Sequence, residues 1–185
     1  MEQSTIRSNR WNEAARYGLV FGAISAVYLY LGHLQGILGL SGFFGNLIGF
    51  LLWAAKFTGC IMLMKHVMRQ FAATNQGVTN SDTFKLGMLI SMLSALVFAI
   101  VTVADQLYIF PEYYQGIYDI MLEEYAKILP ADQMSQITEM IADMPKYSFF
   151  GQFIYCFIYG TVLSLILSRS IPSKDPFQNY KPDEQ

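Results

Sequence analysis

The sequence predicts an all-α integral membrane protein: a four-helix bundle with an extracytoplasmic helical hairpin between its third and fourth spans. Hydrophobic residues make up 54% of the 185 residues and charged residues only 14%, whereas soluble domains carry about 25% charge. Four apolar runs are close to or above the roughly 20 residues that a helix needs to cross a bilayer. The stretch between the last two runs instead has the periodic apolar spacing of amphipathic helices.

The four predicted spans cover about residues 17–40, 43–64, 86–110 and 147–167. Apolar side chains occur on most of their faces, which is unlike the single apolar stripe of a soluble surface helix. The runs lack the alternation of a membrane β-strand, and a helix satisfies its own backbone hydrogen bonds in lipid. We therefore predict one membrane domain, residues 17–170.

Basic residues in the short connections predict the orientation, because cytoplasmic loops are enriched in lysine and arginine. Only Lys127 and Lys146 fall on the side that carries the hairpin. We therefore expect both termini in the cytoplasm, as an N-terminal segment, 1–16, and a tail, 171–185. The three prolines and five charges of the tail predict disorder. Nine basic residues share the side of the termini: Arg7, Arg10, Arg16, Lys65, Arg69, Lys85, Arg169, Lys174 and Lys181.

The segment between the third and fourth spans, residues 111–146, predicts two amphipathic helices. Helical spacing places one apolar stripe before Pro130 and a second between Pro130 and Pro145. Pro130 ends the first helix and suits the first turn of the next. The first stripe comprises Tyr114, Ile117, Tyr118, Met121, Tyr125, Ile128 and Leu129, and the second comprises Met134, Ile137, Ile141 and Met144.

Two interpretations of this hairpin remain open. It is either a helix pair that rests on the lipid surface or over the bundle, with tyrosines at headgroup level, or a docking platform for another membrane protein. The seven acids of the segment suit an anionic lipid surface poorly and favour contact with protein. The docking face would comprise Tyr114, Tyr118, Met121 and Tyr125.

Two ionisable residues lie inside the predicted spans and form the predicted intramembrane polar centre. Lys56 falls near the middle of the second span and Asp105 lies closer to the outer end of the third. Helical side chains lean toward their own N-terminus, so the two groups would lean toward each other in these antiparallel spans. We expect an ion pair that acts as a packing lock, or else a functional site, which would be a proton- or ion-responsive centre or an anion site at Lys56. The third interpretation is that Lys56 snorkels alone.

Other polar residues at similar depths could extend this centre or simply join helices: Thr102, Gln106 and Gln152. His33 and His66 are expected at opposite membrane faces, so they cannot share a metal ion. Cys60 and Cys156 are expected to be small buried apolar residues.

No nucleotide-binding, zinc-protease, redox Cys-x-x-Cys or hydrolase-elbow motif occurs in the sequence. The net charge of −2 excludes a globally basic nucleic-acid binder. We therefore expect no catalytic residues, no cofactor, no metal site and no nucleic-acid partner. Membrane lipid, a membrane-protein partner or a second copy of the chain are the expected partners.

Four short strings together resemble a known family. They are Arg-Tyr-Gly at 16–18, Phe-Lys-Leu-Gly at 84–87, Tyr-Ile-Phe-Pro-Glu-Tyr at 108–113 and Asp-Gln-Met-Ser-Gln-Ile at 132–137. Their order is similar to that in a family of uncharacterised four-span inner-membrane proteins, a domain of unknown function found mainly in Bacteroidota. The resemblance implies a bacterial inner-membrane location. It also implies a partner near the glycosyltransferases that act on polyprenyl-phosphate sugars, but no catalytic residue.

The sequence thus favours a non-enzymatic membrane accessory or scaffold protein, which supports a partner in envelope glycolipid or polyprenyl-phosphate sugar assembly. The alternative is an oligomeric small transporter or channel subunit centred on Lys56 and Asp105.

Overall fold

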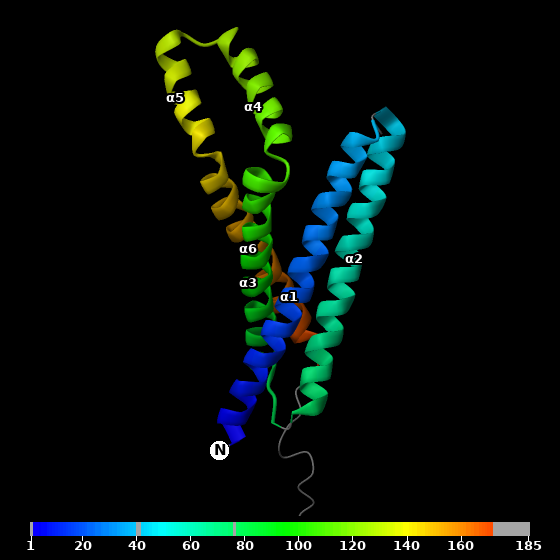
Figure 1. The fold of residues 1–185 in the computed structure, drawn as a ribbon. Coiled ribbons are helices and arrows are strands. Elements are labelled where there is room, and N and C mark those ends of the chain that lie inside the picture. Colours follow the sequence, from blue (N-terminus) through cyan, green and yellow to red (C-terminus); the bar gives the residue numbers. More distant parts are fainter. Residues whose placement is uncertain (1, 40–41, 76, 172–185) are drawn as a thin grey trace, which may run out of the picture.

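The structure is a computed structural model, and it describes residues 2–39, 42–75 and 77–171. Helices joined by short turns make up these ranges, and no strand occurs within them (Figure 1). The predicted all-α class is confirmed. The described helices are α1 (Glu2–Ile37), α2 (Gly42–Thr74), α3 (Asn80–Ala104), α4 (Pro111–Ala126), α5 (Ala131–Ala142) and α6 (Met144–Arg169), with a π-helical turn, η1 (Asp105–Ile109), after α3.

Four of these helical stretches are long and apolar enough to cross a membrane: Ile6–Ile37, Gly42–Thr74, Asn80–Ile109 and Met144–Arg169. They match the four predicted spans in number and order. Most extend beyond the apolar runs because the chain stays helical where it becomes polar. The predicted N-terminal segment, for example, continues α1 without a break over its described residues, and most of the predicted tail lies outside the described residues.

The end of α2 and the start of α3 lie together at the end of the molecule where the core is buried. α2 runs to Thr74, past its predicted end at residue 64, because Val67, Met68 and Phe71 are buried in the core there. A capping box starts α3: the Thr79 hydroxyl accepts from the Asp82 backbone N–H, and the Asp82 carboxylate accepts from the Thr79 backbone N–H. Arg10 of α1 forms a 3.2 Å salt bridge with Asp82. The start of α1 is therefore tied to the start of α3.

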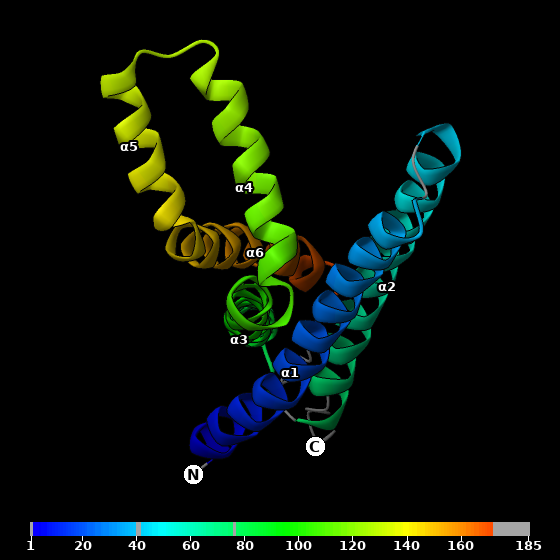
Figure 2. The same cartoon turned by 45° about the horizontal axis from the view of Figure 1, so that its top comes forward.

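α3 is the central helix, and it packs along α1 on one side and α6 on the other (Figures 1 and 2). Glycines of α1 allow the close approach to α3. A Cβ at Gly18 would lie 2.6 Å from Cβ of Leu93, and one at Gly22 would lie 2.6 Å from Cγ1 of Val97. Both distances are shorter than van der Waals contact, so only glycine suits these positions.

The α3–α6 contact repeats one pattern twice. Gly87 of α3 lies directly against Ser164 of α6, and Gly160 of α6 lies directly against Ser91 of α3. Each serine hydroxyl donates to the carbonyl of the glycine four residues earlier on its own helix, at 2.8 Å from Ser91 and 2.7 Å from Ser164. Satisfying these hydroxyls within their own helices leaves two small, complementary surfaces between α3 and α6.

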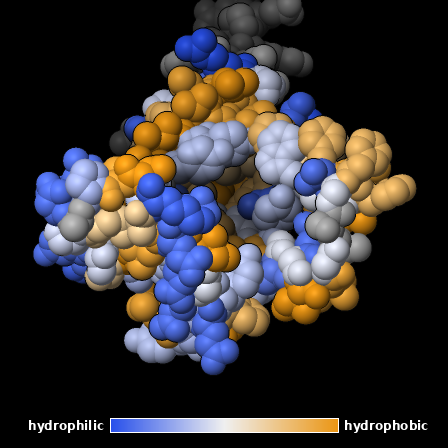
Figure 3. All heavy atoms as spheres, turned by 90° about the horizontal axis from the view of Figure 1, so that it is seen from above, coloured by the Kyte–Doolittle hydropathy of each residue, from blue (hydrophilic) through white to orange (hydrophobic). Residues whose placement is uncertain are grey.

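The helices diverge with distance from the buried end of the molecule, where α2 ends and α3 begins. Figures 1 and 2 show α1 and α2 leaving together in one direction, while α3 continues toward α4 and α5. The first half of α2, which begins at Gly42, therefore has large exposed side chains, among them Phe43, Phe44 and Phe50. A space-filling view from above shows a hollow near the middle of that face, with hydrophobic and hydrophilic residues on its rim (Figure 3).

Two helices, α4 and α5, connect α3 to α6, and they make few contacts with each other (Figures 1 and 2). Proline marks each junction: Pro111 opens α4, Pro130 precedes α5 in an extended conformation with ψ 157°, and Pro145 lies in the first turn of α6. The sequence predicted both helices and the break at Pro130, and the structure contains them.

Candidate functional site

The first candidate site is a buried cluster at the junction of α1, η1 and α4, which we call the Asp105 cluster: His33, Asp105 and Tyr114. The Asp105 side chain is 0% exposed. The Tyr114 hydroxyl donates to Asp105 Oδ2 at 2.7 Å, His33 Nε2 lies 3.6 Å from the same oxygen, and His33 Nε2 and the Tyr114 hydroxyl lie 3.3 Å apart. Three separate elements therefore meet on one carboxylate oxygen.

Aromatic rings surround the His33 ring within this cluster. The centroids of Phe110 and Tyr113 lie 5.1 and 5.0 Å from that of His33, each edge-on, and Tyr30 lies at 6.3 Å. Two atoms remain buried without a protein hydrogen-bond partner, His33 Nδ1 and Asp105 Oδ1. Such unpartnered buried atoms are rare and mark a strained or functional place.

The backbone at this cluster is irregular. α3 changes from α-helix to the π-helical turn η1 at Asp105, and π-helical turns occur often at functional sites. Burial raises the pKa of Tyr114, and the hydrogen bond to Asp105 and the charge of that carboxylate raise it further. Tyr114 therefore keeps its proton and acts as the donor to Asp105.

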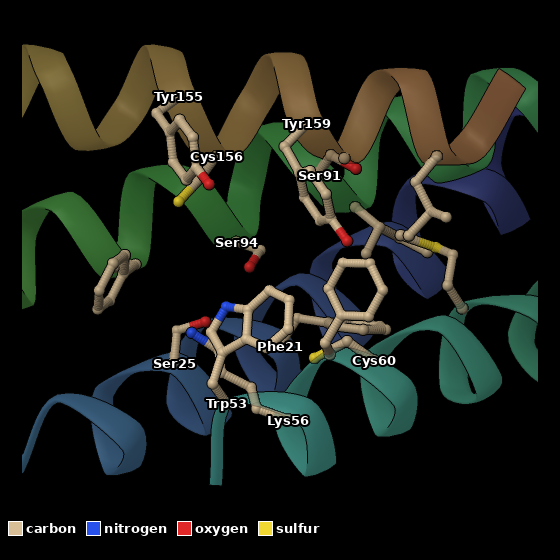
Figure 4. Close-up of a pocket in the computed structure, with 16 residues that line it drawn as sticks. Phe21, Ser25, Trp53, Lys56, Cys60, Ser91, Ser94, Tyr155, Cys156 and Tyr159 are labelled. Carbon is tan, nitrogen blue, oxygen red and sulfur yellow. The ribbon is translucent and has the colours of Figure 1, made fainter. Parts of the chain in front are cut away.

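The second candidate site is a partly open cavity of about 250 Å³ lined by α1, α2, α3 and α6, which we call the Lys56 cavity (Figure 4). Figure 4 shows Lys56 and Cys60 entering it from α2, and Tyr155 and Cys156 from α6. Its walls are mainly apolar and aromatic, with serine hydroxyls from α1 and α3. The lining residues are Phe21, Ser25, Trp53, Lys56, Phe57, Cys60, Met64, Ile90, Ser91, Ser94, Phe98, Tyr155, Cys156, Tyr159, Gly160 and Leu163.

The Lys56 ammonium lies over two aromatic faces. It is 4.6 Å from the ring centroid of Tyr28 and 5.5 Å from that of Phe98. Cation–π contacts of this kind stabilise a charge by about 0.5–2 kcal/mol. They compensate only in part for moving the ammonium out of water.

The predicted direct ion pair between Lys56 and Asp105 is wrong. Over the described part of the chain, the salt-bridge partner of Asp105 is His33, and the Lys56 ammonium lies near aromatic rings. Phe98 precedes Asp105 by two helical turns on α3, which corresponds to about 10 Å of rise. The prediction compared the depths of Lys56 and Asp105 along their helices. It could not identify which helices are neighbours where α2 diverges from α3.

The other residues of the predicted polar centre are dispersed. Thr102 is buried, and its hydroxyl donates to the carbonyl of Phe98 in its own helix at 2.9 Å. Gln106 donates to Ser148 of α6 at 2.9 Å and so joins η1 to α6. Gln152 is half-buried one turn further along α6.

The predicted docking face lies partly inside the protein. Tyr114 belongs to the Asp105 cluster. Tyr118, Met121 and Tyr125 are half-buried on one face of α4, whereas most residues between them in the sequence are exposed. Burial raises the pKa of Tyr118. Met134, Ile137 and Ile141 of α5 are half-buried as well, but α4 and α5 make few contacts with each other, so the docking role of the remaining stripe stays a prediction.

Sequence reasoning missed His33 and Tyr114 as partners of Asp105. One signal was present, because the prediction placed His33 and Asp105 both near the outer ends of their spans. A histidine and a carboxylate at equal depth are candidates for contact. The contribution of Tyr114 depends on the direction in which α4 leaves η1, which the sequence does not show.

Comparisons with known proteins add a family. The family model described as "Protein of unknown function (DUF4199)" matches residues 16–169. The chain belongs to this family. The match includes all four long apolar helices of this DUF4199 member, together with α4, α5 and both candidate sites. Curated proteins and solved structures gave no match to the chain.

Proposed function

We propose that this DUF4199 member is an integral protein of the bacterial inner membrane that crosses the bilayer four times, with both termini in the cytoplasm and α4 and α5 forming an extracytoplasmic helical hairpin. The four long apolar helices support membrane insertion. The basic residues near the buried end of the molecule, including Arg7, Arg10, Lys65 and Arg69, support the orientation.

Within the membrane, we propose a non-enzymatic accessory role in which the chain holds a second membrane protein. The observation that carries this proposal is a helix-packing motif without a neighbour. Gly-x-x-x-Gly motifs let helices approach closely in membranes, and Gly18 and Gly22 contact α3 in this way. At Gly32 and Gly36, by contrast, an added Cβ would meet no atom within 4 Å.

The open motif lies beside other unpacked surface. Leu31, Leu34 and Ile37 of α1 are exposed around it, and the first half of α2 follows the same course with its phenylalanines exposed. We propose that a helix of a partner protein packs against Gly32 and Gly36. The resemblance found in the sequence implies a partner in envelope glycolipid or polyprenyl-phosphate sugar assembly.

The alternative function, a small transporter or channel subunit, depended on a paired Lys56 and Asp105. The structure gives these residues different partners, so no observation now favours this alternative over the accessory role.

Photocrosslinking in intact cells tests the proposed role. A photoreactive amino acid at Leu31 or Leu34 should yield one discrete product with a second protein, whereas the same probe at Leu165, an exposed residue of α6, should not. A product of twice the chain mass would show a second copy at this face. Equal, diffuse labelling at all three positions would show that lipid alone covers it.

A further inference from the structure

Among the described residues, the ammonium in the Lys56 cavity has no anionic partner. The described carboxylates in salt bridges pair with other groups: Asp82 with Arg10, Glu124 with Lys127 and Asp143 with Lys146, while Asp105 lies beside the His33 ring. The nearest aromatic faces, Tyr28 and Phe98, are neutral. Ionisable side chains inside membrane helices face a bundle interior or cavity, and they mark binding sites or pathways.

The remaining walls define the kind of ligand. The Phe21, Trp53 and Phe57 side chains, with aliphatic residues from α3 and α6, make most of the cavity surface apolar. Hydroxyls of Ser25, Ser94 and Tyr159 line the same cavity, so Lys56 is accompanied there by hydrogen-bonding groups (Figure 4). A ligand that matches both features has an anionic head and a long apolar chain.

The cavity is only partly enclosed. α2 forms one of its walls and makes few contacts with α3 and α6, in contrast to the close α1–α3 and α3–α6 contacts. We infer that such a chain would enter on the α2 side, where the wall is packed least tightly.

We propose that the Lys56 cavity binds an amphiphile with an anionic headgroup, carboxylate or phosphate, whose head pairs with the Lys56 ammonium and whose acyl chain lies along the aromatic wall. This site is separate from the Gly32 face and does not depend on the accessory role.

Trp53 lines the cavity and gives a direct readout, because bromine atoms on an acyl chain quench a tryptophan that they contact. The experiment uses the full chain with Trp11→Phe in phosphatidylcholine nanodiscs. The titrants are 9,10-dibromostearic acid, its methyl ester, and brominated phosphatidic acid. We expect saturable quenching by the fatty acid, by the phosphatidic acid or by both, at concentrations at least about tenfold lower than for the ester, because a hydrogen bond to a charged group contributes about 1.5–3 kcal/mol. Which acid saturates first identifies the source of the headgroup.

Variants locate the effect at the cavity. Lys56→Met should raise the half-saturating concentration of the acid about tenfold or more, whereas Lys56→Arg and Lys65→Met should leave it close to wild type. A tryptophan at the exposed Ile158 of α6, in a chain with Trp11→Phe and Trp53→Phe, reports quenching from bulk lipid. Equal quenching by acid and ester in the chain that retains Lys56 would overturn the proposal. This comparison needs no substitution at Lys56. A curve for Trp53 identical to that for the Ile158→Trp probe would also overturn it.

Discussion

The Tyr114 hydroxyl donates a 2.7 Å hydrogen bond to Asp105 and thereby joins the first turn of α4 to the end of α3. His33 of α1 approaches the same carboxylate oxygen. The direction in which α4 leaves η1 therefore depends on a carboxylate that is 0% exposed. The cluster fixes the relative positions of α1, α3 and α4.

Tyr114→Phe should destabilise the protein. It removes the donor that satisfies Asp105 Oδ2 and leaves the buried carboxylate with His33 alone, at a cost of about 1–3 kcal/mol. Thermal unfolding in detergent would measure the loss. Tyr113→Phe is the matched control, since Tyr113 contacts His33 through its ring and is half-exposed, and it should unfold close to wild type. Equal losses in the two variants would contradict the proposed contribution of the Tyr114 hydroxyl.

The same hydrogen bond predicts a pH dependence. Burial and Asp105 raise the pKa of Tyr114 in the folded protein, so its contribution to stability is complete below the unfolded value of about 10 and is lost as the pH rises toward the folded value. Between about pH 10 and 12, the free energy of unfolding should fall more steeply for wild type than for Tyr114→Phe. Denaturant titrations at several pH values would show parallel curves if Tyr114 did not contribute.

Lys56 and Asp105 should behave independently. They have separate partners, so the effects of Lys56→Met and Asp105→Asn on stability should add to within about 0.5 kcal/mol in the double variant. His33→Gln and Asp105→Asn, which change two contacting groups, should not add. A double-mutant cycle measures both. A strong coupling between Lys56 and Asp105 would restore the ion pair that the sequence predicted.

The glycine–serine contacts between α3 and α6 predict that the stability cost of enlarging a glycine of α6 depends strongly on its position. Gly160→Val places a side chain directly against Ser91, and overpacking of this kind costs about 1–3 kcal/mol or more. Gly151→Val on the same helix meets no atom within 4 Å and should be tolerated. Membrane expression and thermal unfolding of the two variants should therefore differ sharply, and similar values would argue against close α3–α6 packing.

Hydropathy and proline position were sufficient to predict the four spans, the two connecting helices and the break at Pro130. The pairing of polar groups was not predictable in the same way, because depth along a helix is readable from the sequence but the neighbouring helix is not. α1 crosses α3 through Gly18 and Gly22 and so delivers His33 to Asp105, while α2 diverges and keeps Lys56 in a separate cavity. The docking face was assigned to the more apolar side of α4. Its first residue, Tyr114, donates to Asp105 within the protein, and docking by the other three residues stays a prediction.

We propose that the open Gly32–Gly36 surface holds a partner protein. Native mass spectrometry of complexes released from the cell's own membranes detects such a complex directly. An added Cβ at Gly32 meets no atom within 4 Å, and leucine is a better helix former than glycine, so Gly32→Leu should fold. If the accessory role is correct, the wild type and Gly151→Leu appear with a second protein in a fixed ratio, and Gly32→Leu appears alone. A wild-type chain that is monomeric or bound only to itself, or a complex that Gly32→Leu leaves intact, would contradict the account.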